Sequence, residues 1–256
     1  MTDRWFLTPM RLPQAPVQLF CLPHAGAGAS AYRGWAAALG TGLEVHAVAL
    51  PGRENRIDDS PELDPDEIAR AIAGRADRPY AIYGHSLGGR LGFQVIRSLR
   101  RSGSVLPQRF YAAACRPPDL KITDGLYDLI ADVPDAELVE KLTTGGAIPA
   151  EVLDYPDLVQ MLLPVFRSDF RWLDNLEYVD EPPLPVPVVA FASVDDPLVS
   201  PRLMGGWGRH TSAGFTLHVL PGGGHLFLRE REVIDLIRVD ALDSIPRLAT
   251  TELGLR

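Results

Sequence analysis

Short runs of consecutive apolar residues alternate along the chain with longer segments in which apolar residues recur every three or four positions. Runs that are apolar throughout are typical of strands buried on both faces, and the longer spacing is typical of amphipathic helices. This alternation predicts an α/β domain with a mostly parallel sheet flanked by helices. The expected strands are Val17–Leu22, Glu44–Leu50, Tyr80–Gly84, Phe110–Cys115, Pro187–Ala192 and Thr216–Leu220. The expected helices are Ala31–Leu39, Asp64–Ala76, Leu87–Arg101, Pro201–His210 and Glu230–Ile245.

The stretch Pro117–Pro185 departs from this rhythm because it contains no convincing strand. We expect an all-helical insertion at about 117–185, which would cover the carboxyl edge of the sheet like a lid, within a single domain spanning 1–256. The Pro-rich segment Glu181–Pro187 would return the chain to the sheet. The helices expected in the insertion are Asp124–Ala131, Asp135–Leu142, Ala150–Asp154 and Asp157–Leu176.

Composition narrows the functional classes. The 256 residues, 46% of them hydrophobic, suffice for one core, and the net charge of −8 without a basic run argues against nucleic-acid binding. Cys21 and Cys115, the only cysteines, lie in apolar runs and are expected to be buried free thiols. The first residues lack a basic start followed by an apolar block, and no apolar stretch approaches the roughly 18 residues of a membrane span. We therefore expect a soluble, cytoplasmic protein.

A candidate nucleophile follows the third expected strand. Gly84-His85-Ser86-Leu87-Gly88 has the form G-x-S-x-G, with an apolar run before it and a helical pattern after it. This order of strand, sharp turn and helix defines the nucleophile elbow of the α/β-hydrolase fold, in which glycines two residues either side of the serine avoid collisions. A chance match in a glycine-rich loop is the alternative, and the flanking elements argue against it. Ser86 is therefore the expected nucleophile of a serine hydrolase.

A serine hydroxyl needs a base within hydrogen-bond reach and a third group that orients the base. In this fold the acid and the histidine follow later strands. His225, in Leu220-Pro221-Gly222-Gly223-Gly224-His225, comes directly after the last expected strand and is the expected base. Among the other histidines, His46 and His218 lie inside expected strands and are expected to be structural. His24 and His85 lie beside the proposed site but in the wrong chain order for the base, and His210 ends an expected helix, where a cation is mildly favoured.

Two adjacent aspartates compete for the role of the acid. Asp195 and Asp196 both follow the strand Pro187–Ala192, and the Pro197 that comes next favours Asp196 by the usual loop pattern of this fold. The other aspartate is expected to cap the helix that begins near Pro201, or to be solvated.

Two backbone N–H groups are expected to form an oxyanion hole. The residue after the nucleophile, Leu87, supplies one, and the loop after the first expected strand supplies the other, for which we choose Ala25. A phosphate-binding loop is the alternative, but the sequence has neither G-x-G-x-x-G nor a P-loop lysine there.

Several segments together resemble the stand-alone (type II) thioesterases of polyketide and nonribosomal peptide assembly lines, and the likeness covers nearly the whole chain. Two small departures, Leu-Gly-Gly after Ser86 and the Gly26-Ala27-Gly28 run, keep small residues where they are needed. The matching segments are Trp5-Phe6, LFCLPHAGAGASAYRGW (19–35), ALPGRENR (49–56), YGHSLGGRLGF (83–93), LLPVFRSDFRWLDNLEY (162–178), DDPLVSP (195–201) and PGGGHLFL (221–228).

The resemblance implies hydrolysis of acyl groups from the phosphopantetheine arm of acyl or peptidyl carrier proteins, by an acyl-enzyme on Ser86 and without metal or cofactor. It also implies that the insertion shapes the acyl pocket. Phe166, Phe170 and Trp172 are candidate lining residues, with ordinary packing as the alternative. Acidic carrier proteins would meet arginines, for which Arg90, Arg116 and Arg167 are candidates, although a solvated arginine is the preferred explanation for each.

Two other functions stay open from the sequence. An α/β-hydrolase that acts on acyl-CoA, free esters or lactones would share the same three residues. A catalytically inactive hydrolase fold that binds a ligand or partner would not need them, and the presence of all three argues against it.

Overall fold

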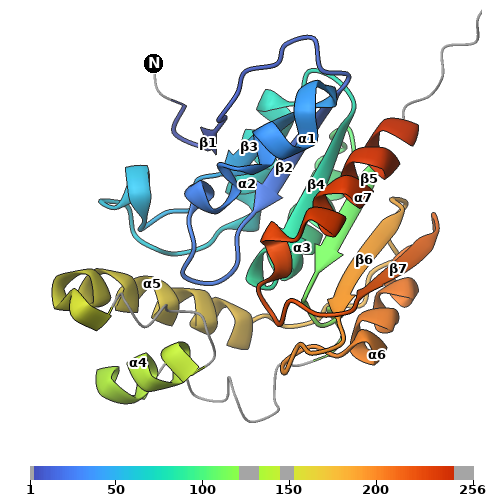
Figure 1. The fold of residues 1–256 in the computed structure, drawn as a ribbon. Coiled ribbons are helices and arrows are strands. Elements are labelled where there is room, and N and C mark those ends of the chain that lie inside the picture. Colours follow the sequence, from blue (N-terminus) through green and yellow to red (C-terminus); the bar gives the residue numbers. More distant parts are fainter. Residues whose placement is uncertain (1–2, 121–132, 145–152, 245–256) are drawn as a thin grey trace, which may run out of the picture.

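A computed structural model describes residues 3–120, 133–144 and 153–244 (Figure 1). Seven strands form one sheet in the order β1-β3-β2-β4-β5-β6-β7, and all neighbours are parallel except β1, which pairs antiparallel with β3. The strands are β1 Phe6–Leu7, β2 Val17–Leu22, β3 Leu43–Val48, β4 Tyr80–His85, β5 Arg109–Ala113, β6 Val188–Ser193 and β7 Phe215–Leu220. The predicted mostly parallel α/β sheet is confirmed, and only the two-residue strand β1 had no prediction.

The apolar runs form strands because both faces of the sheet are covered. Every residue of β2, β3, β4 and β6 is buried, whereas the edge strand β7 is partly exposed. Helices α1 Trp35–Leu39 and α7 Arg231–Asp243 pack on one face, and α2 Pro65–Arg75 and α3 Leu87–Arg101 pack on the other (Figure 1). Two separate apolar clusters therefore enclose the sheet.

Two predicted helices are interrupted at glycines. Residues expected as Ala31–Leu39 form a 3₁₀ turn, η1 Ala29–Tyr32, and then α1, with Gly34 between them. The expected Pro201–His210 begins as α6 Pro201–Met204 and continues as the 3₁₀ segment η5 Gly205–His210. Paired glycines at 205 and 206 lower helix propensity there, which accounts for the change.

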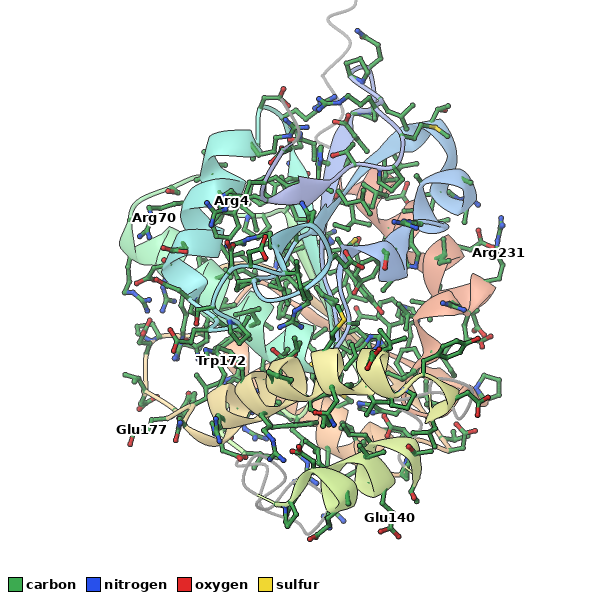
Figure 2. All side chains as sticks on the ribbon, turned by 90° about the vertical axis from the view of Figure 1, so that its left-hand side faces the viewer. Arg4, Arg70, Glu140, Trp172, Glu177 and Arg231 are labelled. Atoms are coloured by element: carbon green, nitrogen blue, oxygen red, sulfur yellow. The ribbon has the colours of Figure 1, made fainter. Side chains whose placement is uncertain are left out.

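The described part of the insertion is helical. It comprises α4 Asp135–Thr144 and α5 Pro156–Asp174, close to the expected bounds. The expected helix Asp124–Ala131 lies outside the described residues, as does most of Ala150–Asp154. Figures 1 and 2 show α5 lying across the carboxyl end of the sheet, with α4 on its outer side. Within the described ranges, no helix has both the length and the apolar content that a membrane span requires.

Candidate active site

The elbow at Ser86 is strained. Its φ and ψ of 53° and −114° are rarely adopted by residues other than glycine, and its N–H donates to the Ala113 carbonyl at 2.8 Å. A Cβ at Gly84 would lie 2.1 Å from the Gly88 carbonyl oxygen, and a Cβ at Gly88 would lie 2.1 Å from the Leu22 carbonyl oxygen. Both motif glycines therefore lie where backbone packs against backbone, which leaves the serine at the tip of a tight turn.

Three loops bring the hydroxyl, imidazole and carboxylate into one hydrogen-bonded chain. The His225 Nε2 lies 2.9 Å from Ser86 Oγ, and its Nδ1 lies 2.9 Å from Asp196 Oδ2. Because a carboxylate only accepts, Nδ1 carries the proton and Nε2 accepts from the serine hydroxyl. The second oxygen of the fully buried Asp196 carboxylate accepts the N–H groups of Leu198 at 2.8 Å and Val199 at 3.1 Å. Those bonds satisfy and orient the carboxylate.

Asp195 has a different role from the one that we expected. It accepts hydrogen bonds from Ser193 Oγ at 2.5 Å and from the Gly224 N–H at 2.9 Å. The prediction that it caps the helix near Pro201 is wrong, because the Ser200 side chain caps α6. The alternative of a solvated side chain agrees with its exposure, although Asp195 also makes these two hydrogen bonds. Asp195 instead ties the loop that carries Asp196 to the residue directly before His225.

His85 also belongs to the site, although the sequence pattern had pointed only to its proximity. Its Nε2 lies 2.7 Å from the backbone carbonyl oxygen of His225, and the Tyr83 hydroxyl lies 3.0 Å from its Nδ1. Complete burial lowers the pKa of His85 well below its usual range, so the ring is neutral. The carbonyl requires a donor at Nε2, so Nδ1 accepts from Tyr83. The strand that carries the nucleophile thus also supports the base.

The backbone N–H groups of Ala25 and Leu87 are the two expected oxyanion donors. In the described part of the chain, neither N–H group donates a hydrogen bond to a protein acceptor. Leu87 begins α3, where the partial positive charge of the helix favours an anion. The next N–H beyond Ala25, that of Gly26, donates to Asp169 at 2.8 Å. Burial, with the positive charges of neighbouring groups, lowers the pKa of His24 to about 4, so this side chain is neutral near pH 7.

The candidate docking arginines do not share one role. Arg90 is buried, not solvated, and its Nη1 donates to the carbonyls of Pro117 at 2.6 Å and Leu120 at 3.0 Å. Because it anchors the start of the insertion from inside, it is unavailable to a docked protein. Arg167 donates to the Val133 carbonyl and to Asp135, which joins α5 to α4.

The aromatic residues of α5 divide between its two sides. Phe166 and Phe170 are buried, with ring centroids 6.1 Å apart. Trp172, labelled in Figure 2, lines a groove of about 660 Å³ between α5 and residues 60–63, and none of the triad residues borders that groove. The groove that Trp172 lines is therefore separate from the triad.

Comparison with known proteins identifies the family. The Thioesterase domain model matches residues 17–240. The chain belongs to the thioesterase family. Among the described residues of this thioesterase, no three His, Cys, Asp or Glu side chains gather as metal ligands.

Individual relatives cover nearly the whole thioesterase chain. The type II thioesterase BorB, from the borrelidin biosynthetic cluster, superposes with a TM-score of 0.81 at 34% identity, over 94% of this chain and 99% of that one. The RedJ thioesterase from the prodiginine pathway of Streptomyces coelicolor gives 0.80 at 30% identity, over 92% of each chain. A Brevibacillus parabrevis protein, linear gramicidin dehydrogenase LgrE, is 34% identical over 90% of this chain and 89% of its own.

Proposed function

We propose that this thioesterase removes acyl groups from the phosphopantetheine arm of carrier proteins in polyketide or nonribosomal peptide assembly lines, using Ser86, His225 and Asp196. The observation that carries the chemistry is the continuous chain of 2.9 Å contacts from hydroxyl to imidazole to carboxylate. The carrier-bound substrate is supported by the likeness to BorB, a type II thioesterase from the borrelidin biosynthetic cluster, and to RedJ, a thioesterase from the prodiginine biosynthetic pathway.

In the first half-reaction the Ser86 oxygen attacks the thioester carbonyl carbon while its proton passes to His225 Nε2. The Ala25 and Leu87 N–H groups stabilise the resulting oxyanion. The intermediate collapses as the C–S bond breaks, and the imidazolium returns the proton to the pantetheine sulfur. The acyl group is left as an ester on Ser86 and the carrier protein leaves with a free thiol.

In the second half-reaction water replaces the thiol. His225 takes a proton from the water as its oxygen attacks the ester carbonyl, and the same two N–H groups stabilise the second oxyanion. Collapse breaks the bond to Ser86, whose oxygen recovers the proton, and the free acid departs. Asp196 stabilises the imidazolium in both steps. The protein needs no cofactor for this cycle, and the phosphopantetheine belongs to the substrate. We also propose a cytoplasmic location, which is consistent with the two buried free thiols of Cys21 and Cys115.

The name of LgrE raises a second possibility, a reduction that uses a dinucleotide. The loop after β2 is where such a cofactor would place its diphosphate in a related α/β fold. Here that loop faces two carboxylates, because Glu54 reaches the N–H and hydroxyl of Ser30, and Asp169 accepts from Gly26. The Gly26 and Ser30 N–H groups are therefore already bonded to side-chain carboxylates and are not free to bind a diphosphate, so the arrangement favours hydrolysis.

The choice among acyl substrates is tested by kinetics. We expect kcat/KM to be highest for acyl groups carried on holo carrier proteins, lower for the same acyl groups on CoA or pantetheine, and lowest for simple esters. The matched control is Ser86→Ala, which should hydrolyse none of them. An equal or higher kcat/KM on simple esters would contradict the carrier-protein assignment while leaving the serine-hydrolase chemistry intact.

A further inference from the structure

The helical insertion reaches the oxyanion loop, residues 23–28, through one buried carboxylate. Asp169 on α5 accepts the Gly26 N–H at 2.8 Å, and its side chain is fully excluded from solvent. Gly26 directly follows Ala25, the proposed oxyanion donor. A helix more than a hundred residues later in the chain therefore holds the backbone of this loop by a hydrogen bond.

Arg53 completes this connection from a third segment of the chain. Its Nη1 and Nη2 lie 2.8 and 2.7 Å from the two oxygens of Asp169, which is a bidentate pair. The same Nη1 donates to the Ala27 carbonyl at 3.1 Å, and Nε donates to the Pro51 carbonyl at 3.2 Å. One buried guanidinium thus holds α5 and the oxyanion loop together.

A packing contact reinforces the same junction. Gly26 has a φ of +75°, and a Cβ there would lie 2.1 Å from the ring of Phe166, one turn before Asp169 on α5. The ring therefore rests directly on the loop backbone. Phe166 and Asp169 together make α5 the outer support of the loop.

Physical chemistry suggests why an ion pair stands here. Replacing a buried ion pair by apolar residues often leaves the free energy of unfolding unchanged or raises it. A contribution to folding stability is therefore a weak reason for the presence of Arg53 and Asp169 here. An unpaired carboxylate near the oxyanion would oppose the charge that develops there, and Arg53 neutralises it. The pair can therefore accept the Gly26 N–H strongly without placing net negative charge beside the reaction.

We propose that Arg53 and Asp169 are positioning residues, which hold the oxyanion loop in its reactive conformation and make hydrolysis depend on α5 being docked. The proposal rests on the proposed role of Ser86 and of the Ala25 N–H. Neither side chain touches the reacting atoms; each acts through the backbone at 26 and 27.

The decisive variant is the double substitution Arg53→Met/Asp169→Leu. Removing both charges together avoids leaving one buried and unpaired, so the midpoint of urea unfolding should fall less than in either single variant. We expect kcat on an acyl-carrier-protein thioester to fall roughly 10- to 100-fold, with KM changed less than about 2-fold. This is smaller than the roughly 10²–10³-fold loss on deleting an oxyanion donor, because the donor is displaced and not removed.

A second carboxylate supplies the matched control. Glu44, at the start of β3, accepts the Leu12 N–H at 2.9 Å and an Arg78 Nη2 at 2.9 Å. The partners are of the same kind, but they lie at the amino ends of the strands, away from Ser86. Arg78→Met/Glu44→Leu should leave kcat within about 2-fold of the wild-type value.

Each outcome bears on the proposal. Wild-type kcat in Arg53→Met/Asp169→Leu overturns it, and so does an equal loss of kcat in the Glu44 control. If the double variant does not fold, Arg53→Lys is the variant to use, because it keeps a positive charge beside Asp169 but loses the bidentate geometry. We expect a several-fold lower kcat at constant KM in Arg53→Lys, and an unchanged kcat would again overturn the proposal. A wild-type protein inactive on every thioester would instead refute the proposed function.

Discussion

Replacement of His85 should slow hydrolysis although this side chain meets no reacting atom. His85→Leu removes the donor that contacts the His225 carbonyl at 2.7 Å and leaves that buried oxygen without a partner. An unsatisfied buried acceptor costs about 1–3 kcal/mol. If the loop relaxes to satisfy it, His225 leaves its position 2.9 Å from Ser86 Oγ. The same energy expressed in the transition state corresponds to a roughly 5- to 150-fold lower kcat.

The assay compares three variants at saturating thioester, with circular dichroism as the check on folding. His85→Gln retains a donor near the position of Nε2 and should recover most of kcat. Tyr83→Phe removes only the hydroxyl that donates to His85 Nδ1 at 3.0 Å, so its loss should be smaller, within about 5-fold. KM should stay nearly constant throughout, because no variant touches the substrate. A folded His85→Leu protein with wild-type kcat would refute this reasoning, as would a Gln variant no faster than the Leu variant.

Other parts of the structure give three further expectations. Gly88→Ala places a Cβ against the Leu22 carbonyl and should destabilise the protein by more than about 3 kcal/mol in urea unfolding. Gly74→Ala, in open space on α2, should instead stabilise the protein by about 0.5–1 kcal/mol. Equal effects of the two substitutions would contradict the packing argument. Burial lowers the pKa of His46 from 6.5 to about 4, so the unfolded chain binds this proton at a higher pH than the folded protein does. The free energy of unfolding should therefore fall by roughly 3 kcal/mol as the pH is lowered from 6.5 to 4. An equally steep fall in the His46→Gln variant would count against this explanation. Asp196→Asn should lower kcat about 10³–10⁴-fold and Asp195→Asn less than about 10-fold, and the reverse order would show that the wrong aspartate was chosen.

Local patterns predicted most of the fold and the three triad positions. The elbow is recognisable because its glycines, strand and helix are adjacent in the chain, and α3 has the predicted bounds of Leu87–Arg101. Chain order in the fold then pointed to loops after two later strands, and the structure brings His225 and Asp196 together there. Their catalytic roles stay predictions until they are tested.

Contacts between distant segments escaped the sequence patterns. Arg53 and Asp169 lie 116 positions apart, and no periodicity connects a turn after β3 with a helix of the insertion. Arg90 reads as a surface arginine in an amphipathic helix, yet it is buried and its Nη1 donates to carbonyls at the start of the insertion. Likewise, His85 occupies a variable position of the G-x-S-x-G motif, and only the fold shows that its ring reaches the His225 carbonyl. Burial and pairing of polar groups depend on tertiary packing, which no single segment encodes.

The transfer of the acyl group itself is the most direct test of the account. A carrier protein with an isotopically labelled acyl group on its phosphopantetheine arm is mixed with the enzyme, quenched in acid within milliseconds and analysed by peptide mass spectrometry. We predict that the label appears transiently on the peptide containing Ser86 before the free acid accumulates, and that Ser86→Ala leaves the carrier protein loaded. Label on a different residue, or clearance of the carrier by the alanine variant at the wild-type rate, would contradict the proposed mechanism.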